Sequence, residues 1–271
     1  MFGAICGDVI GSVYEWRPPR GGWEEFPLFE VRTRFTDDTV MTIAVADALM
    51  RWNGNGNFRE MLIDSMHAYG NTYPRAGYGK KFASWIRGRN RQAYNSFGNG
   101  SAMRVSPVGW FAESLDEAEE LACASADITH NHPEGVKGAQ SVAGSIFLAR
   151  QGKSKNEIRD YVATKYGYDL LRTLNDIKPS YFFDVTCQGS VPEAIIAFLE
   201  SSNYEEAIRK AIWLGGDADT QAAISGSIAE AFYGNVPPHI AAGVINHLDD
   251  QLFEKYQEWQ QFMQERASRK I

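Results

Sequence analysis

The chain has 271 residues, 44% of them hydrophobic and 23% charged, which is enough to build one large domain around a substantial core. Its 27 basic and 34 acidic residues give a net charge of −7, and no lysine- or arginine-rich run occurs. This charge pattern argues against a nucleic-acid backbone as a general partner.

Cysteines and apolar runs indicate the compartment. Cys6, Cys123 and Cys187 lie far apart and form no CxxC pair, which is typical neither of a disulfide framework nor of a zinc site. No apolar run reaches the roughly 18 residues of a membrane helix, and the first residues lack the basic segment of a signal peptide. We therefore predict a cytoplasmic protein in which residues 1–271 form a single domain.

The first predicted element is a helix at the N-terminus. Three glycines share one stripe of it: Gly3, Gly7 and Gly11. Glycine inside a helix costs about 1 kcal/mol relative to alanine, so the stripe predicts close approach by a neighbouring helix or by a ligand. Residues 16–35 then form a long irregular stretch, and loops of this length are often functional.

Thr36 and two adjacent aspartates stand immediately before the next predicted helix, 40–51. Oxygens of Asp and Thr accept backbone N–H groups at helix N-termini, so capping accounts for one of Asp37 and Asp38. Capping accounts poorly for both, because adjacent carboxylates repel each other when buried. A divalent cation would turn this repulsion into shared attraction.

Helical patterns continue along most of the chain. Ser114 followed by Glu117 is typical of a capping box, and Pro133 suits a first helical position. We predict further helices over 114–127, 133–152, 191–202, 204–216, 219–234 and 247–270. Strand alternation is nearly absent, although 180–186 could extend briefly. The patterns predict an all-α fold.

A second acidic cluster follows the flexible pair Gly215-Gly216. Asp217, Asp219 and Thr220 supply oxygen donors where the helix 219–234 begins. Together the two clusters offer four carboxylates and two threonine hydroxyls but no histidine or cysteine, a set that suits Mg²⁺, Mn²⁺ or Ca²⁺ and is large enough for two metal ions. Each cluster alone is explained by capping, whereas both together favour metal binding.

Two more acids belong to the N-terminal helix. Glu15 stands where that helix gives way to the long loop, a place that suits a movable general base or a metal ligand as well as an ordinary surface residue. Asp8 lies inside the apolar stretch, either as a buried hydrogen-bonded acid or as a group that supports the metal ligands.

Five blocks of the sequence, spanning residues 3–234 in order, resemble those of the ADP-ribosylglycohydrolase family: GAICGDVIGSVYE, FTDDTVMTIAVADAL, GNGSAMRVSPVGW, ITHNHPEGVKGA and GGDADTQAAISGSIAEAFYG. The resemblance implies an all-α fold with two Mg²⁺ or Mn²⁺ ions in a cleft. It also implies hydrolysis of the glycosidic bond between ADP-ribose and a protein side chain or a small conjugate, by a protein that we expect to be monomeric.

The resemblance also implies roles for individual residues. The metal ligands carried over are Thr36, Asp37, Asp38, Asp217, Asp219 and Thr220. Glu15 becomes the catalytic acid of a serine-directed branch, with Asp38 as a second candidate, while an arginine-directed branch varies more here. The implied contacts to phosphate and ribose are Asn99, Gly100, Ser101, Met103 and His130. A structural or capping histidine remains an equal interpretation of His130, and Phe97, Tyr78 and Trp110 are guesses for stacking on adenine.

Two other functions fit the same residues. One is a different helical metal-dependent phosphohydrolase, although the chain has no His-Asp dipeptide, which one such class requires. The other is a non-catalytic module that binds ADP-ribose. Since the acids expected for catalysis are all present, the hydrolase is the favoured interpretation.

Overall fold

The computed structural model describes residues 1–88 and 91–269. Within these ranges the chain forms helices joined by irregular segments, and the extended pairing is limited to one isolated antiparallel bridge between Gly98 and Thr186. The all-α prediction is confirmed, and the segment 180–186 extends without forming a strand. The helices are α1 Phe2–Gly11, α2 Asp37–Trp52, α3 Phe58–Thr72, α4 Lys80–Arg87, α5 Gly100–Met103, α6 Ser106–Phe111, α7 Leu115–Asp127, α8 Pro133–Arg150, α9 Lys155–Tyr166, α10 Leu174–Ile177, the 3₁₀ turn η1 Lys178–Ser180, α11 Cys187–Leu199, α12 Tyr204–Leu214, α13 Ala218–Tyr233, α14 Pro238–Ile245 and α15 Asp250–Ser268.

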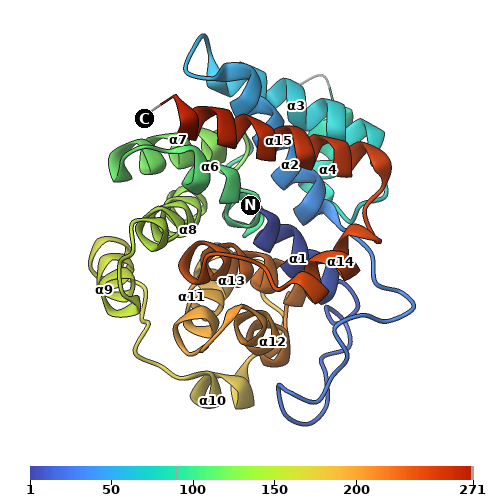
Figure 1. The fold of residues 1–271 in the computed structure, drawn as a ribbon, viewed down its shortest axis with the longest axis vertical. Coiled ribbons are helices and arrows are strands. Elements are labelled where there is room, and N and C mark those ends of the chain that lie inside the picture. The colour runs from blue at the N-terminus through green and yellow to red at the C-terminus, as the bar shows by residue number, and fades with distance from the viewer. Residues whose placement is uncertain (89–90, 270–271) are drawn as a thin grey trace.

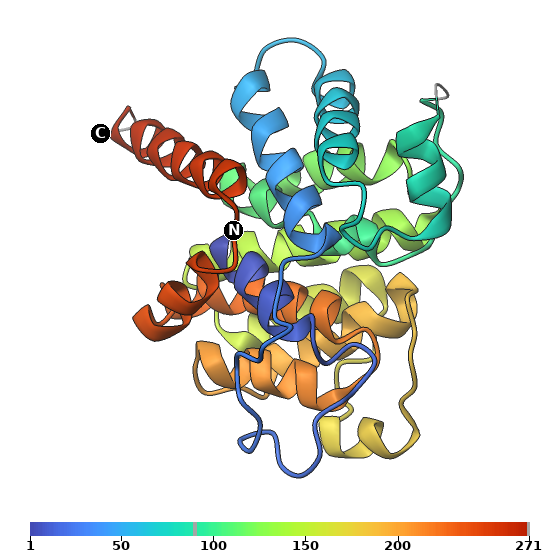
Figure 2. The same cartoon turned by 90° about the vertical axis from the view of Figure 1, so that its right-hand side faces the viewer.

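The helices gather into two groups around a shared core (Figure 1). One group contains α2, α3, α4 and α15, and the other contains α1, α11, α12 and α13. Figure 2 shows the same division from the side, with the long loop between α1 and α2 running along the second group. The N-terminal ends of α2 and α13, which carry the acidic clusters, therefore face each other from different groups.

Most predicted helices lie close to their expected ranges. Ser114 caps α7 by accepting from the Glu117 N–H at 3.1 Å, but the Glu117 carboxylate accepts from the backbone of Glu113, so the capping box is incomplete. The last predicted helix, 247–270, is α15, which begins three residues later than expected; its predicted end at Lys270 lies outside the described residues. The sequence patterns did not single out α3, α4, α9 or α14.

The glycine stripe of α1 lies directly against α13. A Cβ added to Gly3 would lie 2.3 Å from the Gly226 carbonyl oxygen, one on Gly7 would lie 2.1 Å from that of Ala222, and one on Gly11 would lie 2.5 Å from the Asp219 Cα. Backbone-to-backbone approach of this kind leaves no room for a side chain. The stripe therefore serves helix packing, and it places the end of α1 beside the start of α13.

Helix α1 ends at Gly11, so Glu15 belongs to the turn that follows it. Residues 16–35 contain no helix, as predicted, and hydrogen bonds hold this loop on the second helix group. The Trp213 indole donates to the Gly21 carbonyl at 2.9 Å, and the Arg209 guanidinium donates to the Phe26 carbonyl at 2.7 Å. Among the described residues, no helix combines the length and apolar character needed to cross a bilayer.

Candidate active site

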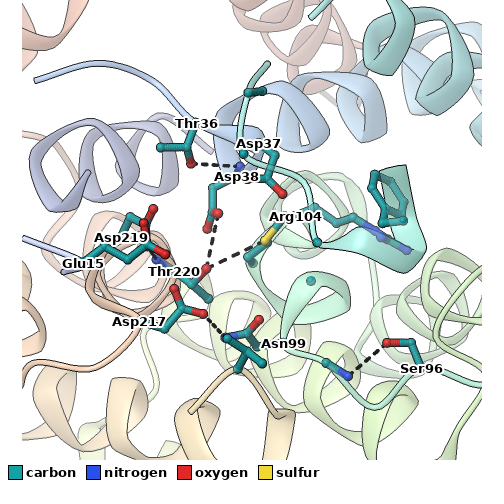
Figure 3. A pocket seen from close by; sticks show the side chains of 18 of the residues that line it. Glu15, Thr36, Asp37, Asp38, Ser96, Asn99, Arg104, Asp217, Asp219 and Thr220 are labelled. Carbon is teal, nitrogen blue, oxygen red and sulfur yellow. Dashed lines mark hydrogen bonds between the residues drawn. The ribbon is translucent and has the colours of Figure 1, made fainter. Parts of the chain in front are cut away.

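A cavity of about 540 Å³ opens where α2, α13 and α5 begin. Figure 3 shows the side chains of Asp38, Asp217 and Asp219 pointing toward one another across it, whereas Asp37 points to another side. Thr36, Asp37 and Asp38 come from α2 and the residue before it, while Asp217, Asp219 and Thr220 come from the start of α13. The structure thus brings together two clusters that are about 180 positions apart in the sequence.

The carboxylates form two overlapping groups. Oxygens of Asp8, Asp38 and Asp219 lie within 4.8 Å of one another, and so do those of Glu15, Asp217 and Asp219. Asp219 is shared by both groups. Asp37 lines the cavity but belongs to neither group, and a Cβ added to Gly77 would lie 2.9 Å from its carboxylate. Of the four predicted aspartate ligands, three are therefore clustered and one stands apart.

Asp8 connects α1 to the start of α2. It is fully buried and accepts hydrogen bonds from the Thr36 N–H at 2.9 Å, the Thr36 hydroxyl at 2.6 Å and the Thr39 N–H at 3.0 Å, as well as from the Thr39 hydroxyl. These bonds satisfy N–H groups at the helix N-terminus, where a negative charge is favoured. Asp8 is thus both a hydrogen-bonded core acid and part of the carboxylate cluster.

Asp38 is the least satisfied of these acids. The Thr220 hydroxyl donates to its Oδ2 at 3.2 Å, but its buried Oδ1 has no hydrogen-bond partner. A buried carboxylate oxygen without a donor is costly unless something else supplies positive charge. The orphan oxygen therefore favours an additional ligand at this point.

Two glycines and an asparagine set the position of Asp217. Gly215 and Gly216 adopt φ angles of 87° and 78°, which favour glycine, and they turn the chain into α13 with Asp217 at the N-cap. The Asn99 amide donates to Asp217 Oδ2 at 2.7 Å and to the Ser190 hydroxyl at 3.2 Å. Asn99, which the sequence suggested as a phosphate or ribose contact, is committed in this structure to Asp217.

The clustered acids disfavour one another's ionisation. Burial and the charges of Asp8 and Asp219 raise the pKa of Asp38, and burial and the charge of Asp219 raise that of Asp217. Burial and Glu15 raise the pKa of Asp219 to about 6. Like charges in a buried site can be retained when a cation compensates them.

This donor set fits divalent cations with a preference for oxygen. It combines buried carboxylates, two threonine hydroxyls and an unpartnered oxygen, with no sulfur or imidazole in either carboxylate group. Such ligands suit Mg²⁺, Mn²⁺ or Ca²⁺. The fit rests on Asp219 together with Asp8, Asp38, Glu15 and Asp217.

Four of the five predicted phosphate and ribose contacts line the same cavity. His130 is 5% exposed, and a Cβ added to Gly100 would lie 3.2 Å from its Nε2, so the loop passes close to the imidazole. Asn99, Gly100, Met103 and His130 all line the cavity. Ser101 does not, because its hydroxyl points away and donates to the Gly135 carbonyl at 2.7 Å.

Several residues that line the cavity were missed by the sequence analysis: Trp16, Arg34, Lys80, Lys81, Phe82, Tyr94, Ser96, Phe183 and Val185. None of the three aromatic residues guessed for adenine lines it. Trp110, for example, packs under the Arg150 guanidinium at 5.3 Å. Long loops and α4 contribute most of the missed residues, and their approach to the acids depends on tertiary packing. Two features of the sequence could have indicated them: the end of the helical pattern at Glu15 and the aromatic residues in 180–186.

Fold and site together define a helical protein whose cleft presents a carboxylate cluster suited to hard cations. Residues 1–262 match the sequence model of the ADP-ribosylglycohydrolase family, so the chain belongs to that family. This confirms the resemblance seen in the sequence and assigns the protein to a class of glycohydrolase enzymes.

Two named relatives illustrate the similarity. The ADP-ribosylhydrolase ARH3 of Gallus gallus is 28% identical, with 88% of this chain and 86% of that protein covered. The ADP-ribosylarginine hydrolase Tri1 of Pseudomonas putida (strain GB-1) is 26% identical, with 94% and 77% covered. A solved ADP-ribosylglycohydrolase-related protein complex has the same fold, with a TM-score of 0.71, 22% identity, and 97% of this chain and 95% of that chain covered.

Proposed function

We propose that this enzyme hydrolyses the glycosidic bond that joins ADP-ribose to a modified protein side chain or a small conjugate, and that the reaction depends on two bound Mg²⁺ or Mn²⁺ ions. The cluster of Glu15, Asp217 and Asp219, continuous through Asp219 with Asp8 and Asp38, carries this proposal. When bound, such cations orient sugar hydroxyls and polarise the groups near the scissile bond.

The cavity lining combines two kinds of chemistry. Glu15, Asp38 and Asp217 supply carboxylates, and His130 and the loop that leads into α5 supply an imidazole and backbone groups. A ligand with the scissile bond among the acids would place its nucleotide toward His130. Lys80 and Lys81, which also line the cavity, offer positive charge to a pyrophosphate.

Glu15 is the proposed general base. Burial raises its pKa, although the Trp16 side chain and the charge of Arg34 oppose the shift. A carboxylate with a raised pKa accepts a proton better. Water would form a bond to the anomeric carbon as the bond to the target atom breaks; Glu15 would take the proton of the water, and the released side chain would gain one.

Asp38 is the alternative base, because its Oδ1 lacks a hydrogen-bond partner. Thr36 and Thr220 are then proposed to complete the metal ligands together with Asp37, Asp38, Asp217 and Asp219. Asp37 is the weakest member of this set on geometric grounds, since it lies outside both carboxylate groups.

The deciding experiment incubates the protein with arginine-linked and serine-linked ADP-ribosyl peptides, in Mg²⁺, in Mn²⁺ and in EDTA. We expect release of ADP-ribose from one linkage in metal and loss of release in EDTA. Glu15→Gln should lower kcat by about 10²-fold with KM little changed, because a general base contributes about this much. The matched variant Glu24→Gln, in the same loop but outside the cavity lining, should retain the wild-type rate.

Other results would redirect the proposal. Thermal stabilisation by ADP-ribose without release from any conjugate would indicate a binding module. Indifference to ADP-ribose would favour a phosphohydrolase. Full activity of Glu15→Gln would move the base to Asp38.

A further inference from the structure

Two irregular segments meet at the mouth of the cavity. Trp16 follows Glu15 in the turn after α1, and Phe183 lies in the extended segment 181–186. Their rings stack with centroids 4.5 Å apart and an interplanar angle of 21°, and both residues line the cavity. The proposed chemistry uses Glu15 but assigns nothing to this pair.

Trp16 is linked directly to Glu15. Its side chain opposes the rise in pKa that burial causes at the adjacent Glu15 carboxyl, and the indole N–H is the one polar group of that side chain. Trp16 is nevertheless 72% exposed, an unusual state for so large an apolar side chain. Among the described residues, Phe183 provides its ring contact. The indole next to Glu15 therefore depends on Phe183 for its own orientation.

Phe183 lies on a segment that is tied to the rest of the site. The Val185 carbonyl accepts from the Asn99 N–H at 2.8 Å, and the Cys187 N–H donates to the Phe97 carbonyl at 2.9 Å. On the other side of Phe183, the Tyr181 hydroxyl donates to the Gly189 carbonyl at 2.8 Å. Phe183 is thus held between two anchored points.

The same segment also packs beside Asp217. A Cβ added to Gly216 would lie 2.7 Å from the Tyr181 ring, so this ring sits against the backbone that leads into Asp217. Asn99, bound to Val185 through its backbone, holds the Asp217 carboxylate through its side chain. Segment 181–186 therefore contacts Gly216 and Asn99, which position Asp217. Through the ring of Phe183 it also contacts Trp16, the neighbour of Glu15.

We propose that Trp16 is a positioning residue for Glu15 and that the Phe183 ring holds Trp16 in place, an inference that rests on the proposed role of Glu15 as the base. The turn after α1 contributes no helical hydrogen bonds to Glu15, so the side-chain contacts define where its carboxylate sits. Small displacements of a catalytic group lower turnover strongly without weakening ligand binding in proportion.

The kinetic test compares three variants on whichever ADP-ribosyl peptide is cleaved. Trp16→Phe keeps an aromatic ring but removes the N–H donor, and Phe183→Ala removes the stack. Each should lower kcat about tenfold and leave KM within about twofold, because a displaced catalytic group slows the chemical step more than it weakens binding. Phe182→Ala is the matched control, because Phe182 is adjacent, 73% exposed and outside the cavity lining, and it should keep the wild-type kcat.

Combination with Glu15→Gln decides whether Trp16 acts through Glu15. In that background, Trp16→Phe and Phe183→Ala should cause no further loss of kcat. A further tenfold loss, or a rise in KM that persists in the double variants, would overturn positioning and would indicate that the two rings bind substrate directly.

A measurement without turnover separates this inference from the proposed function. With 5-fluorotryptophan in the seven tryptophan positions, the ¹⁹F resonance of Trp16 is identified by its loss in Trp16→Phe. That resonance should shift in Phe183→Ala and in Glu15→Gln but not in Phe182→Ala. An unchanged resonance in the first two variants would overturn the positioning role even if the enzyme were active, whereas absent release of ADP-ribose with the expected shifts would refute only the proposed function.

Discussion

The floor of the cavity and its mouth hold their acids in different ways. On the floor, Asp8 and Asp219 sit where α1, α2 and α13 pack against one another, and Asp8 accepts hydrogen bonds from two threonines. At the mouth, Glu15 lies in a turn and relies on the exposed, stacked ring of Trp16. The difference teaches that acids proposed to bind metal are built into the core, whereas the proposed base is positioned by loops.

The largest expected effect comes from the acid shared by both carboxylate groups. Asp219→Asn should abolish Mn²⁺ binding measured by calorimetry and reduce release of ADP-ribose by at least about 10³-fold, because electrostatic groups of this kind have effects of that order. Glu15→Gln should lose less of the Mn²⁺ affinity than Asp219→Asn, because Glu15 belongs to only one of the two groups. Equal loss of metal binding in the two variants would remove the distinction between floor and mouth.

The seam between α1 and α13 should be the next most sensitive point. Gly7→Ala places a Cβ 2.1 Å from the Ala222 carbonyl oxygen, a backbone atom that cannot rotate away. We expect a loss of about 3 kcal/mol in the free energy of unfolding in urea. Gly79→Ala is the control, since a Cβ there meets nothing within 4 Å, and an equal loss in both variants would contradict the packing argument.

Asp8 and Glu15 should differ in their contributions to stability at saturating Mg²⁺. Asp8→Asn puts amide hydrogens against the donors of Thr36 and Thr39, so we expect a loss of about 2 kcal/mol in the free energy of unfolding. Glu15→Gln should stay within about 0.5 kcal/mol of the wild type. A destabilised Glu15→Gln protein would show that the mouth, too, supports the fold.

The smallest expected effect is the contribution of His130 to the pH dependence of stability. Burial, reinforced by the charge of Arg104, lowers the pKa of His130 well below its usual value. As the pH falls below about 6.5, the unfolded chain takes up a proton at His130 that the folded protein does not, so stability present above that pH is lost, by at most about 1.4 kcal/mol per pH unit.

The test follows the free energy of unfolding from pH 7.5 to 5.5 in the wild type and in His130→Asn. The carboxylates with raised pKa values contribute in the opposite direction, but they are common to both proteins, so the difference between them isolates His130. The wild type should lose more stability than the variant on acidification. Parallel curves would place His130 in a more solvated environment than the one described.

Much of the fold could be predicted because its signals are local. The helix 219–234 and the cap at Ser114 depend on residues that are neighbours in sequence, and the glycine stripe already indicated a close helix contact. Ser154 and Glu157, a complete capping box at α9, would have revealed one missed helix. That Asp37 belongs to the metal ligands stays a prediction. Asp37 lies outside both carboxylate groups, and its side chain points in a different direction from that of Asp38 (Figure 3).

By itself, the sequence predicted which residues would carry the chemistry, because its acidic pairs stand at helix starts without competing histidine or sulfur ligands, and its ordered blocks identified the family. Only the tertiary structure decided that Asp219 is shared between two groups, that Asn99 serves Asp217, and that Phe183 meets Trp16. The physical reason is the sequence separation over which each kind of interaction acts. Helix caps and stripes are set by hydrogen bonds and spacing within a few residues, whereas contacts between residues some 100 to 200 positions apart exist only after the helices have packed.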